Sequence, residues 1–589
     1  MTTHTQLPVS SGAHPNLPAE PRRGEFLGHP VGLFLLFMVE MWERFSYYGM
    51  RALLVLYLTS PTSGMRNRPA GTPEGFNPGP GWADSDASTL YGWYTGLAYL
   101  LPVIGGIIAD KLIGTHRSML VGGILIACGH IALAVSGLGA FAHEPIGMSI
   151  FIFGLAVIVL GTGHFKPSVS VMVGQLYKPG DPRRDGAFSI FYMGINLGAF
   201  LCAFVCGTLG EKVGWHWGFG AAAVGMFLGL IMYLIGRPMF LQGIGEVAQP
   251  DVRSTCANCG YEMAGLPSNK CPECGQPNAA PTVRTVSRQT STGFGFMFII
   301  VGFALSALFA FFYHIGALRS LAGIMTPMVT VPLAVIVFGL AAWFVAVQRP
   351  GEKGPVASIF IFMLFNAFFW LAFEQAGSSM TLFTDRYTDA HIGSWRMPTT
   401  WFQSVNPAII FIFAPVFAAM WTFLGRRKIN LNQPIKISMG LILLGLGFIV
   451  LVMGARTIKV GPGGPEDVIT RAAIWYILAA YFLHTMGELC LSPTGLSYVT
   501  KAAPVRFVSL LMGIWFISSF IANLSGGLIA AQTEKLEKGE IKLPWNLGEG
   551  TGSVQADFFT LFVITSIGAG IAILVLTPVL RKLMRDPND

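Results

Sequence analysis

A charged and aromatic stripe within the first long apolar segment is the part of the sequence best suited to chemistry. It consists of Glu40, Glu43, Arg44, Tyr47, Tyr48 and Arg51. The two acids, the two arginines and the first tyrosine lie at offsets of 0, 3, 4, 7 and 11, so on an α-helix they share one face with Tyr48 at its margin. Ionised groups at bilayer depth are costly, so such a face points at a water-filled cavity or at partner charges. Two interpretations follow: a buried ion-pair helix of a soluble protein, or a membrane pathway for protons and a charged solute.

The overall composition favours the membrane interpretation. Of 589 residues, 53% are apolar and 12% are charged, whereas soluble domains carry about 25% charged residues. The net charge is +8, but the basic residues lie mostly in loops between apolar segments, which argues against nucleic acid as a partner. Residues 1–29 are polar and Pro-rich without a hydrophobic core, so we expect a disordered cytoplasmic tail and no cleaved signal peptide.

Apolar runs long enough to cross about 30 Å of hydrocarbon predict fourteen spans and an all-α membrane protein. The runs lie near 31–59, 88–110, 118–139, 147–176, 187–210, 217–236, 292–314, 321–347, 356–384, 402–424, 434–454, 472–499, 507–531 and 556–580. Lysine and arginine are enriched in every second loop, which predicts that both termini lie inside. Arg44, Arg51 and Lys166 are the basic residues that remain within spans, and this makes them candidates for function.

The spans divide the chain into five predicted regions. These are the tail at 1–29, a six-helix bundle at 30–237, a cytoplasmic loop at 238–291, an extra helix pair at 292–348 and a second six-helix bundle at 349–589. Two related bundles around a polar centre are typical of transporters whose binding site lies at mid-membrane between the halves.

Five sequence stretches resemble motifs of known transporters. GGIIADKLIGTHR at 105–117 resembles the loop after the second helix of the major facilitator superfamily, in which Asp110, Lys111 and Arg117 would help to close the cytoplasmic side. Helix motifs of the proton-dependent oligopeptide transporter (POT/PTR) family of that superfamily resemble EMWERFSYYG at 40–49, GTGHFKPSVS at 161–170, FYMGINLGAF at 191–200 and GELCLSPTGLS at 487–497. The resemblance covers nearly all of 30–580 and implies a major facilitator fold. The extra pair matches the bacterial fourteen-helix type.

The substrate that this resemblance implies is a di- or tripeptide, a zwitterion that needs cations at one end of its site and an acid at the other. The planar guanidinium of Arg44, which can donate two parallel hydrogen bonds to a carboxylate, and the ammonium of Lys166 can bind the peptide carboxylate. Tyr48, together with Tyr47, can add a hydroxyl donor. Lys166 has an alternative role as part of a purely structural ion pair.

The amino end of a peptide can be bound by Glu488 with Asn196 and Asn406. The two amides have an alternative role as interhelical hydrogen-bonding groups. The resemblance implies the same division of roles and adds four pocket walls: Tyr99, Trp370, Trp515 and Ser519. Judged alone, the tryptophans would be taken as core packing.

Depth along the helices predicts two ion pairs between the halves. Arg51 lies roughly 16 Å further out than Glu40 at about 1.5 Å per residue, and Glu374 lies late in another outward-running span. Lys166 and Glu488 lie at similar depths in two inward-running spans. We therefore expect Arg51–Glu374 and Lys166–Glu488 as gating pairs, with coincidence of register as the alternative.

Proton coupling is expected at Glu40, Glu43, Arg44 and Glu374. An acid beside a cation stays ionised, and it takes up a proton more readily when that cation is withdrawn in a desolvated site. A peptide carboxylate that binds Arg44 would withdraw this cation from the neighbouring acids, so binding and protonation favour one another. Protonation of Glu374 would release Arg51.

A cysteine-rich insert at 256–274 does not belong to the transporter pattern. Cys256 with Cys259, and Cys271 with Cys274, form two CxxC knuckles separated by eleven residues. Four thiolates suit tetrahedral Zn²⁺, so the insert resembles a zinc ribbon with a structural metal site. A redox dithiol pair is the alternative.

These observations predict a proton-coupled symporter that imports di- and tripeptides across the cytoplasmic (inner) membrane of a bacterium. Its partners would be small peptides, protons and membrane lipid, with the oligomeric state left open. One alternative is a carrier of another solute, such as nitrate, a drug or an amino-acid conjugate, on the same fold. Another is a receptor regulated through the zinc ribbon. An enzyme is not expected, because no nucleophile–base motif is present, and His164 is expected to serve in packing.

Overall fold

A computed structural model describes residues 24–69, 71–177, 181–246, 292–316, 338–427, 431–462, 467–504 and 507–584. The predicted tail is therefore almost wholly outside the described residues. Within the described part the chain is almost entirely helical, which confirms the all-α prediction.

The predicted zinc ribbon lies outside the described residues, together with all four of its expected metal ligands, Cys256, Cys259, Cys271 and Cys274. Among the residues that the structure does describe, no group of three or more His, Cys, Asp or Glu side chains is arranged to hold a metal ion. The zinc site at Cys256, Cys259, Cys271 and Cys274 therefore has no support from the structure and stays a prediction from the spacing of the cysteines.

The first half of the protein is a bundle of long helices. Its elements are β1 (Glu25–Phe26), β2 (His29–Pro30), α1 (Val31–Thr59), α2 (Asp84–Ile108), η1 (Ala109–Ile113), α3 (Thr115–Val135), η2 (Gly139–His143), α4 (Pro145–Gln175), α5 (Arg184–Cys202), η3 (Ala203–Gly207), α6 (Thr208–Lys212) and α7 (Trp215–Phe240). Small residues allow these helices to approach closely, as expected of membrane bundles. A Cβ added at Gly129 of α3 would lie 2.7 Å from the carbonyl oxygen of Gly154 in α4.

The second half repeats the bundle. Its elements are α11 (Pro350–Phe373), η4 (Glu374–Gly377), α12 (Ser379–Tyr387), β3 (Thr388–Asp389), β4 (His391–Ile392), β5 (Trp395–Arg396), η5 (Thr399–Ser404), α13 (Val405–Arg426), α14 (Gln433–Ala455), β6 (Lys459–Val460), β7 (Val468–Thr470), β8 (Ala472–Ala473), α15 (Ile474–Ala502), α16 (Val508–Ala530), α17 (Gln532–Glu537) and α18 (Gln555–Met584). The short strands pair antiparallel as β1–β2, β4–β5 and β6–β7, and parallel as β3–β8.

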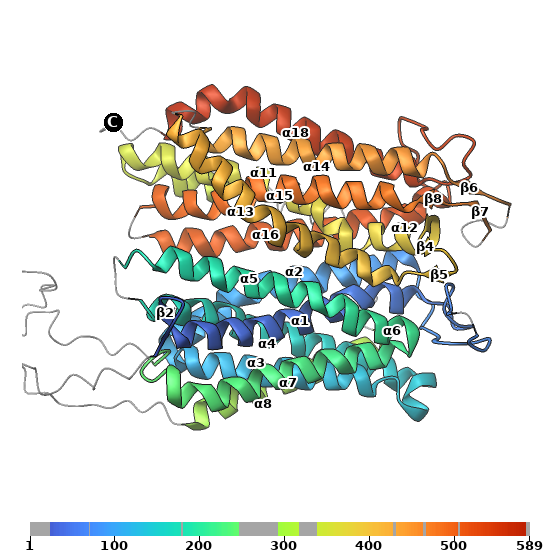
Figure 1. Ribbon diagram of the computed structural model, residues 1–589, viewed down its shortest axis with the longest axis horizontal. Coiled ribbons are helices and arrows are strands. Elements are labelled where there is room, and N and C mark those ends of the chain that lie inside the picture. Colours follow the sequence, from blue (N-terminus) through green and yellow to red (C-terminus); the bar gives the residue numbers. More distant parts are fainter. Residues whose placement is uncertain are drawn as a thin grey trace, which may run out of the picture.

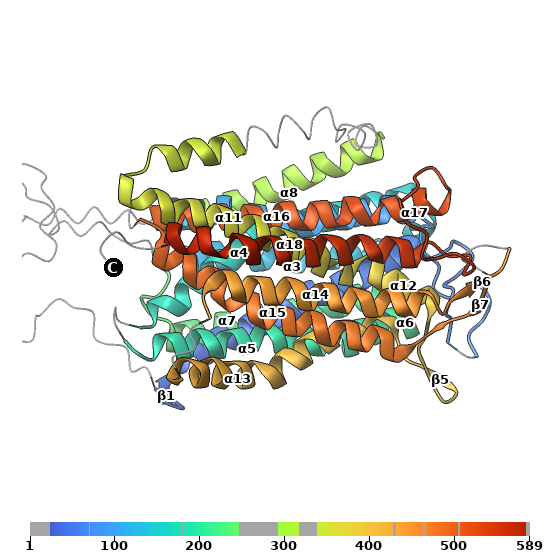
Figure 2. The same ribbon diagram turned by 90° about the horizontal axis from the view of Figure 1, so that it is seen from above.

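The two halves lie side by side with their long helices nearly parallel (Figure 1). The hairpin β1–β2 and the end of α18 lie at one end of the molecule, and the strands β4–β8 lie at the opposite end. We call the end that carries strands β4–β8 the outer end, following the predicted orientation. Between the halves in sequence, α8 (Thr292–His314) packs at the edge of the first bundle (Figure 2), where Phe298 and Phe303 contact a cluster that includes Val121 and Val157.

Twelve helices in the described part are long and apolar enough to cross a membrane. The helix α1 has 29 residues, but its charged face keeps it out of that set. Of the predicted span 321–347, residues 338–346 are described as helix and 317–337 lie outside the described residues.

One predicted span differs from the structure in an informative way. The apolar run 356–384 was expected to form a single helix, but α11 ends at Phe373 and a 3-10 turn, η4, separates it from α12. The break falls at Ser378, whose φ of −128° and ψ of −97° are not helical. The turn begins with Glu374, the predicted gating carboxylate, which directly follows the last residue of α11.

Candidate functional site

The charged face of α1 is held together by one arginine and two acids. Arg44 Nε donates a hydrogen bond to Glu40 Oε1 at 2.7 Å and lies 3.0 Å from Glu43 Oε2. All three side chains are buried. Within the described part of the chain, Glu40 Oε2 and both carboxylate oxygens of Glu43 have no hydrogen-bond partner. A single cation therefore serves two carboxylates, and Glu40 Oε2 and Glu43 Oε1, which have no hydrogen bond among the described residues, can accept a proton.

Tyrosines line the same face. Tyr47 packs edge-on against Tyr48, with 5.2 Å between ring centroids, and stacks on Tyr94 of α2 at 6.2 Å. The Arg44 guanidinium lies 5.9 Å from the Tyr47 ring centroid, within range of a cation–π contact. Tyr94 was not among the predicted site residues. A spacing signal was available, since Tyr91 and Tyr94 lie three residues apart on the predicted second span, as neighbours on one helix face do.

A close approach of α5 to α1 positions Arg44. At Gly198, in the motif at 191–200, an added Cβ would lie 2.2 Å from the Met41 carbonyl oxygen and 3.1 Å from Arg44 Cβ. The backbone of α5 therefore rests directly on the turn of α1 that carries Arg44.

Lys166 on α4 contacts an aromatic ring. Its Nζ lies 3.6 Å from the centroid of the Tyr99 ring on α2. The structure thus brings together two residues that were predicted separately, one as a cation and one as a pocket wall. A Lys ammonium over a tyrosine face is a favourable but modest interaction, so the ammonium remains available to an anion.

Glu488 on α15 is held by an amide from α13. Asn406 Nδ2 donates to Glu488 Oε2 at 2.8 Å and to Thr485 Oγ1 at 3.0 Å. Thr485 was not predicted. Among the described ion pairs none joins Lys166 to Glu488. The predicted Lys166–Glu488 pair is therefore not formed in this conformation, and its gating role stays a prediction.

The described hydrogen bonds and ring contacts of the other predicted site residues, Asn196 of the amino-binding end and the walls Trp370, Trp515 and Ser519, lie within their own helices. Asn196 Nδ2 donates to the Tyr192 carbonyl oxygen at 3.0 Å. Trp370 packs against Phe373 with ring centroids 5.1 Å apart. Trp515 is buried, and the Ser519 carbonyl accepts a hydrogen bond from Asn523. These contacts leave the expected pocket roles of Asn196, Trp370, Trp515 and Ser519 as predictions. His164 contacts Ser118 Oγ at 3.1 Å and the Phe298 ring, in line with its expected packing role.

The structure contains an ion pair between Arg51 and Glu374, as expected from their depths, and the gating role of this pair stays a prediction. Arg51 Nη2 donates to Glu374 Oε2, and Arg51 Nε donates to the Tyr91 hydroxyl at 2.6 Å. Both members of the ion pair are largely shielded from solvent. The pair joins α1 of the first half to η4 of the second, toward the outer end.

A second ion pair joins the two halves toward the outer end and was not predicted. Arg386 on α12 donates from both Nη atoms to the two Asp84 carboxylate oxygens at 2.6 Å each. Because Arg386 lies beyond the break in the predicted span, sequence alone did not assign its depth. Nearby, Asn67 Nδ2 donates to the Asp385 carbonyl and carboxylate oxygens at 2.7 and 2.8 Å.

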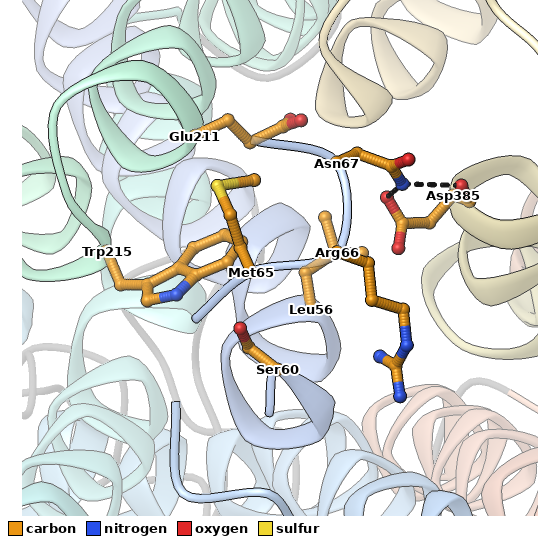
Figure 3. A pocket seen from close by; sticks show the side chains of 8 residues that line it. All are labelled: Leu56, Ser60, Met65, Arg66, Asn67, Glu211, Trp215 and Asp385. Atoms are coloured by element: carbon orange, nitrogen blue, oxygen red, sulfur yellow. Dashed lines mark hydrogen bonds between the residues drawn. The ribbon is translucent and has the colours of Figure 1, made fainter. Parts of the chain in front are cut away.

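A small cavity lies in this outer region (Figure 3). Its volume is about 10 Å³, and Glu211, Asn67 and Asp385 are among its polar lining residues. About one water molecule would fit such a volume, so the cavity is not a peptide site. Both ion pairs that join the halves in the described residues lie toward this end, so the conformation is closed at the outer end.

Comparison with known proteins agrees with this architecture. The sequence matches the POT family over residues 116–260 and 334–545. It is 35% identical over 578 residues to the peptide transporter YePEPT of Yersinia enterocolitica, covering 95% of this chain and 96% of that protein. It is 31% identical over 566 residues to a di-/tripeptide transporter of Lactococcus lactis subsp. cremoris, covering 95% and 98%.

The fold is also similar to that of solved peptide transporters. A crystal structure of the peptide transporter POT in complex with sulfate superposes with a TM-score of 0.69 at 33% sequence identity, over 96% of this chain and 98% of that one. The fold, its charged first helix and these similarities together show that the chain belongs to the POT family, a family of membrane transporters.

Proposed function

We propose that this protein is a proton-coupled symporter that imports di- and tripeptides across the cytoplasmic membrane of a bacterium, with both termini inside. The observation that carries the proposal is the buried cluster of Arg44 with Glu40 and Glu43, in which one cation is shared by two acids. The similar proteins named as peptide transporters support the substrate class.

The peptide carboxylate would bind at the cationic end of the site. Arg44 and Lys166 lie on α1 and α4 of the first half, and each has an aromatic ring beneath it, Tyr47 and Tyr99 respectively. The peptide amino group would bind Glu488 on the second half, whose carboxylate is oriented by Asn406. A short peptide that spans these ends would then join the two halves.

Proton coupling follows from the shared cation. When a peptide carboxylate binds Arg44, the guanidinium interacts less with Glu43, whose oxygens have no hydrogen-bond partner in the described structure. A buried acid that loses its cation takes up a proton more readily. Peptide binding and proton binding therefore favour one another, and thermodynamic linkage makes the effect reciprocal.

Gating would use the cross-half ion pairs. In the conformation described, Arg51–Glu374 and Arg386–Asp84 hold the outer end closed. Protonation of Glu374 would remove one partner and favour outer opening. In the opposite state, Lys166 and Glu488 would approach each other and close the inner end.

Uptake of a labelled dipeptide into proteoliposomes under an imposed pH gradient tests the proposal. Wild-type protein should concentrate the dipeptide, and Glu43→Gln should lose this accumulation but keep peptide exchange without a gradient, because the carboxylate-binding Arg44 remains. The matched control is Glu246→Gln, which removes a surface carboxylate paired with Arg237. Normal accumulation by Glu43→Gln would show the coupling mechanism to be wrong. A panel of unlabelled competitors, including nitrate and amino-acid conjugates, separates peptide transport from carriage of another solute.

A further inference from the structure

A buried carboxylate of the first half caps a helix of the second half at the outer end. Glu211 on α6 accepts hydrogen bonds from Thr399 N at 2.9 Å, Thr400 N at 2.8 Å and Thr400 Oγ1 at 2.7 Å. The donors belong to η5, the turn that leads directly into α13. An acid is electrostatically favoured at a helix N-terminus, where main-chain N–H groups lack partners. Here the acid comes from the opposite half of the protein.

Further contacts fix η5 against the same part of the first half. Trp401 Nε1 donates to Thr208 Oγ1 at 2.9 Å, and Ser404 Oγ donates to the Phe200 carbonyl oxygen at 2.9 Å. At Gly207, an added Cβ would lie 2.1 Å from Thr400 Oγ1, so the missing side chain is what permits this approach. Gly207 ends the π-helical turn η3, and such turns are often found at functional positions.

Among the described residues, the buried carboxylate of Glu211 lacks the cationic partner that buried acids usually have. It is buried and makes no ion pair within 4.0 Å among the residues that the structure describes. Burial of a carboxylate without a cation is costly unless strong hydrogen bonds compensate. In this conformation, described partners on the opposite half, Thr399 and Thr400, provide three such bonds, and separation of the halves at the outer end would break them.

The capped turn is connected to the proposed amino-binding residues by a short length of chain. The turn η5 ends at Ser404, α13 begins at Val405, and the next residue is Asn406. Asn406 is the residue that orients Glu488. A change in the position of η5 is therefore transmitted along the start of α13 to the hydrogen bond that aims the Glu488 carboxylate.

We propose that Glu211 is a positioning residue for peptide recognition: its cap on η5 holds Asn406, and through Asn406 the Glu488 carboxylate, in place while the outer end is closed. This inference rests on the proposed function, because it takes Glu488 as the group that binds the peptide amine. Its consequence is that the affinity for the free amino group depends on closure of the outer end.

The test compares binding of a dipeptide with binding of its N-acetylated form, measured calorimetrically on the purified full-length protein. The ratio of the two affinities reports recognition of the ammonium group. Glu211→Gln should reduce the ratio about tenfold, the effect of misplacing one charge-assisted hydrogen bond. Thr400→Val, which removes the hydroxyl donor and keeps the main-chain donor, should reduce it less and serves if Glu211→Gln does not fold.

The matched control is Glu534→Gln. Glu534 also accepts hydrogen bonds across the halves at the outer end, from Ser85 N at 3.1 Å and Ser85 Oγ. It lies on α17, and among the described residues none of its hydrogen bonds or ion pairs reaches η5 or α13. The ratio of the two dipeptide affinities in the Glu534→Gln variant should stay at the wild-type value. A loss equal to that of Glu211→Gln would overturn the inference, because loosening of the outer end alone would then explain both.

Glu488→Gln separates failure of this inference from failure of the proposed function. If Glu488→Gln lowers the ratio while Glu211→Gln and Thr400→Val leave it unchanged, Glu211 does not position the site, and the proposed function stands. If Glu488→Gln also leaves the ratio unchanged, the assignment of the amino-binding end is wrong, and the inference about Glu211 fails with it.

Discussion

The substitution Gly198→Ala tests how closely the packing of α5 on α1 controls the substrate site. The added Cβ would lie 2.2 Å from the Met41 carbonyl oxygen and 2.9 Å from Phe45 N, both backbone atoms that cannot rotate away. Since ordinary contacts begin near 3.4 Å, the two helices must separate locally by about 1 Å. Overpacking of this kind costs about 1–3 kcal/mol of stability.

The same displacement should affect binding, because Arg44 Cβ lies 3.1 Å from the added atom. Weakening one charge-assisted hydrogen bond to the peptide carboxylate by about 1.4 kcal/mol raises KM about tenfold. We therefore expect Gly198→Ala to unfold at a lower temperature and to show a raised KM for dipeptide uptake.

The measurements are thermal unfolding of the purified protein and concentration-dependent uptake in proteoliposomes. Gly186→Ala on the same helix is the control, because its Cβ would meet nothing closer than His29 Cε1 at 3.7 Å. Should Gly198→Ala match Gly186→Ala in both unfolding temperature and KM, the close approach of α5 does not hold Arg44 in place, and this reasoning is refuted.

Two further predictions concern the outer gate and the cysteine insert. Arg51→Glu and Glu374→Arg should each abolish gradient-driven uptake, and the double variant should recover part of it, because the exchanged charges can pair again; uptake by all three variants measures this, and absence of any recovery would contradict the gating role of the pair. The purified protein should contain about one zinc ion per chain by elemental analysis, as four thiolates imply, and Cys256→Ser should lower that content while Cys128→Ser, in α3, leaves it unchanged; equal zinc in both variants would contradict the zinc ribbon.

Much of the candidate site was predictable from the sequence because it is local to single helices. The face shared by Glu40, Glu43 and Arg44 follows from helical periodicity alone, and the structure shows these three charges in contact. The Arg51–Glu374 pair was found by counting residues along two spans, since a regular rise converts sequence position into depth. Depth alone does not determine contact, however, as Lys166 and Glu488 were placed at similar heights but form no pair in this state.

Contacts that depend on irregular backbone or on neighbouring helices could not be derived in this way. The break at Ser378 redirects the chain after Glu374 and brings Arg386 to Asp84, and the prediction of one span over 356–384 did not include it. The cap of Glu211 on Thr400 joins residues far apart in sequence, and the close approach of Thr400 to Gly207 leaves no room for a side chain there, which hydropathy does not reveal. Hydrophobic pattern and spacing are sufficient to place residues along a helix that crosses a membrane. Which residues meet between helices depends on how the two halves pack and on which end of the molecule is closed.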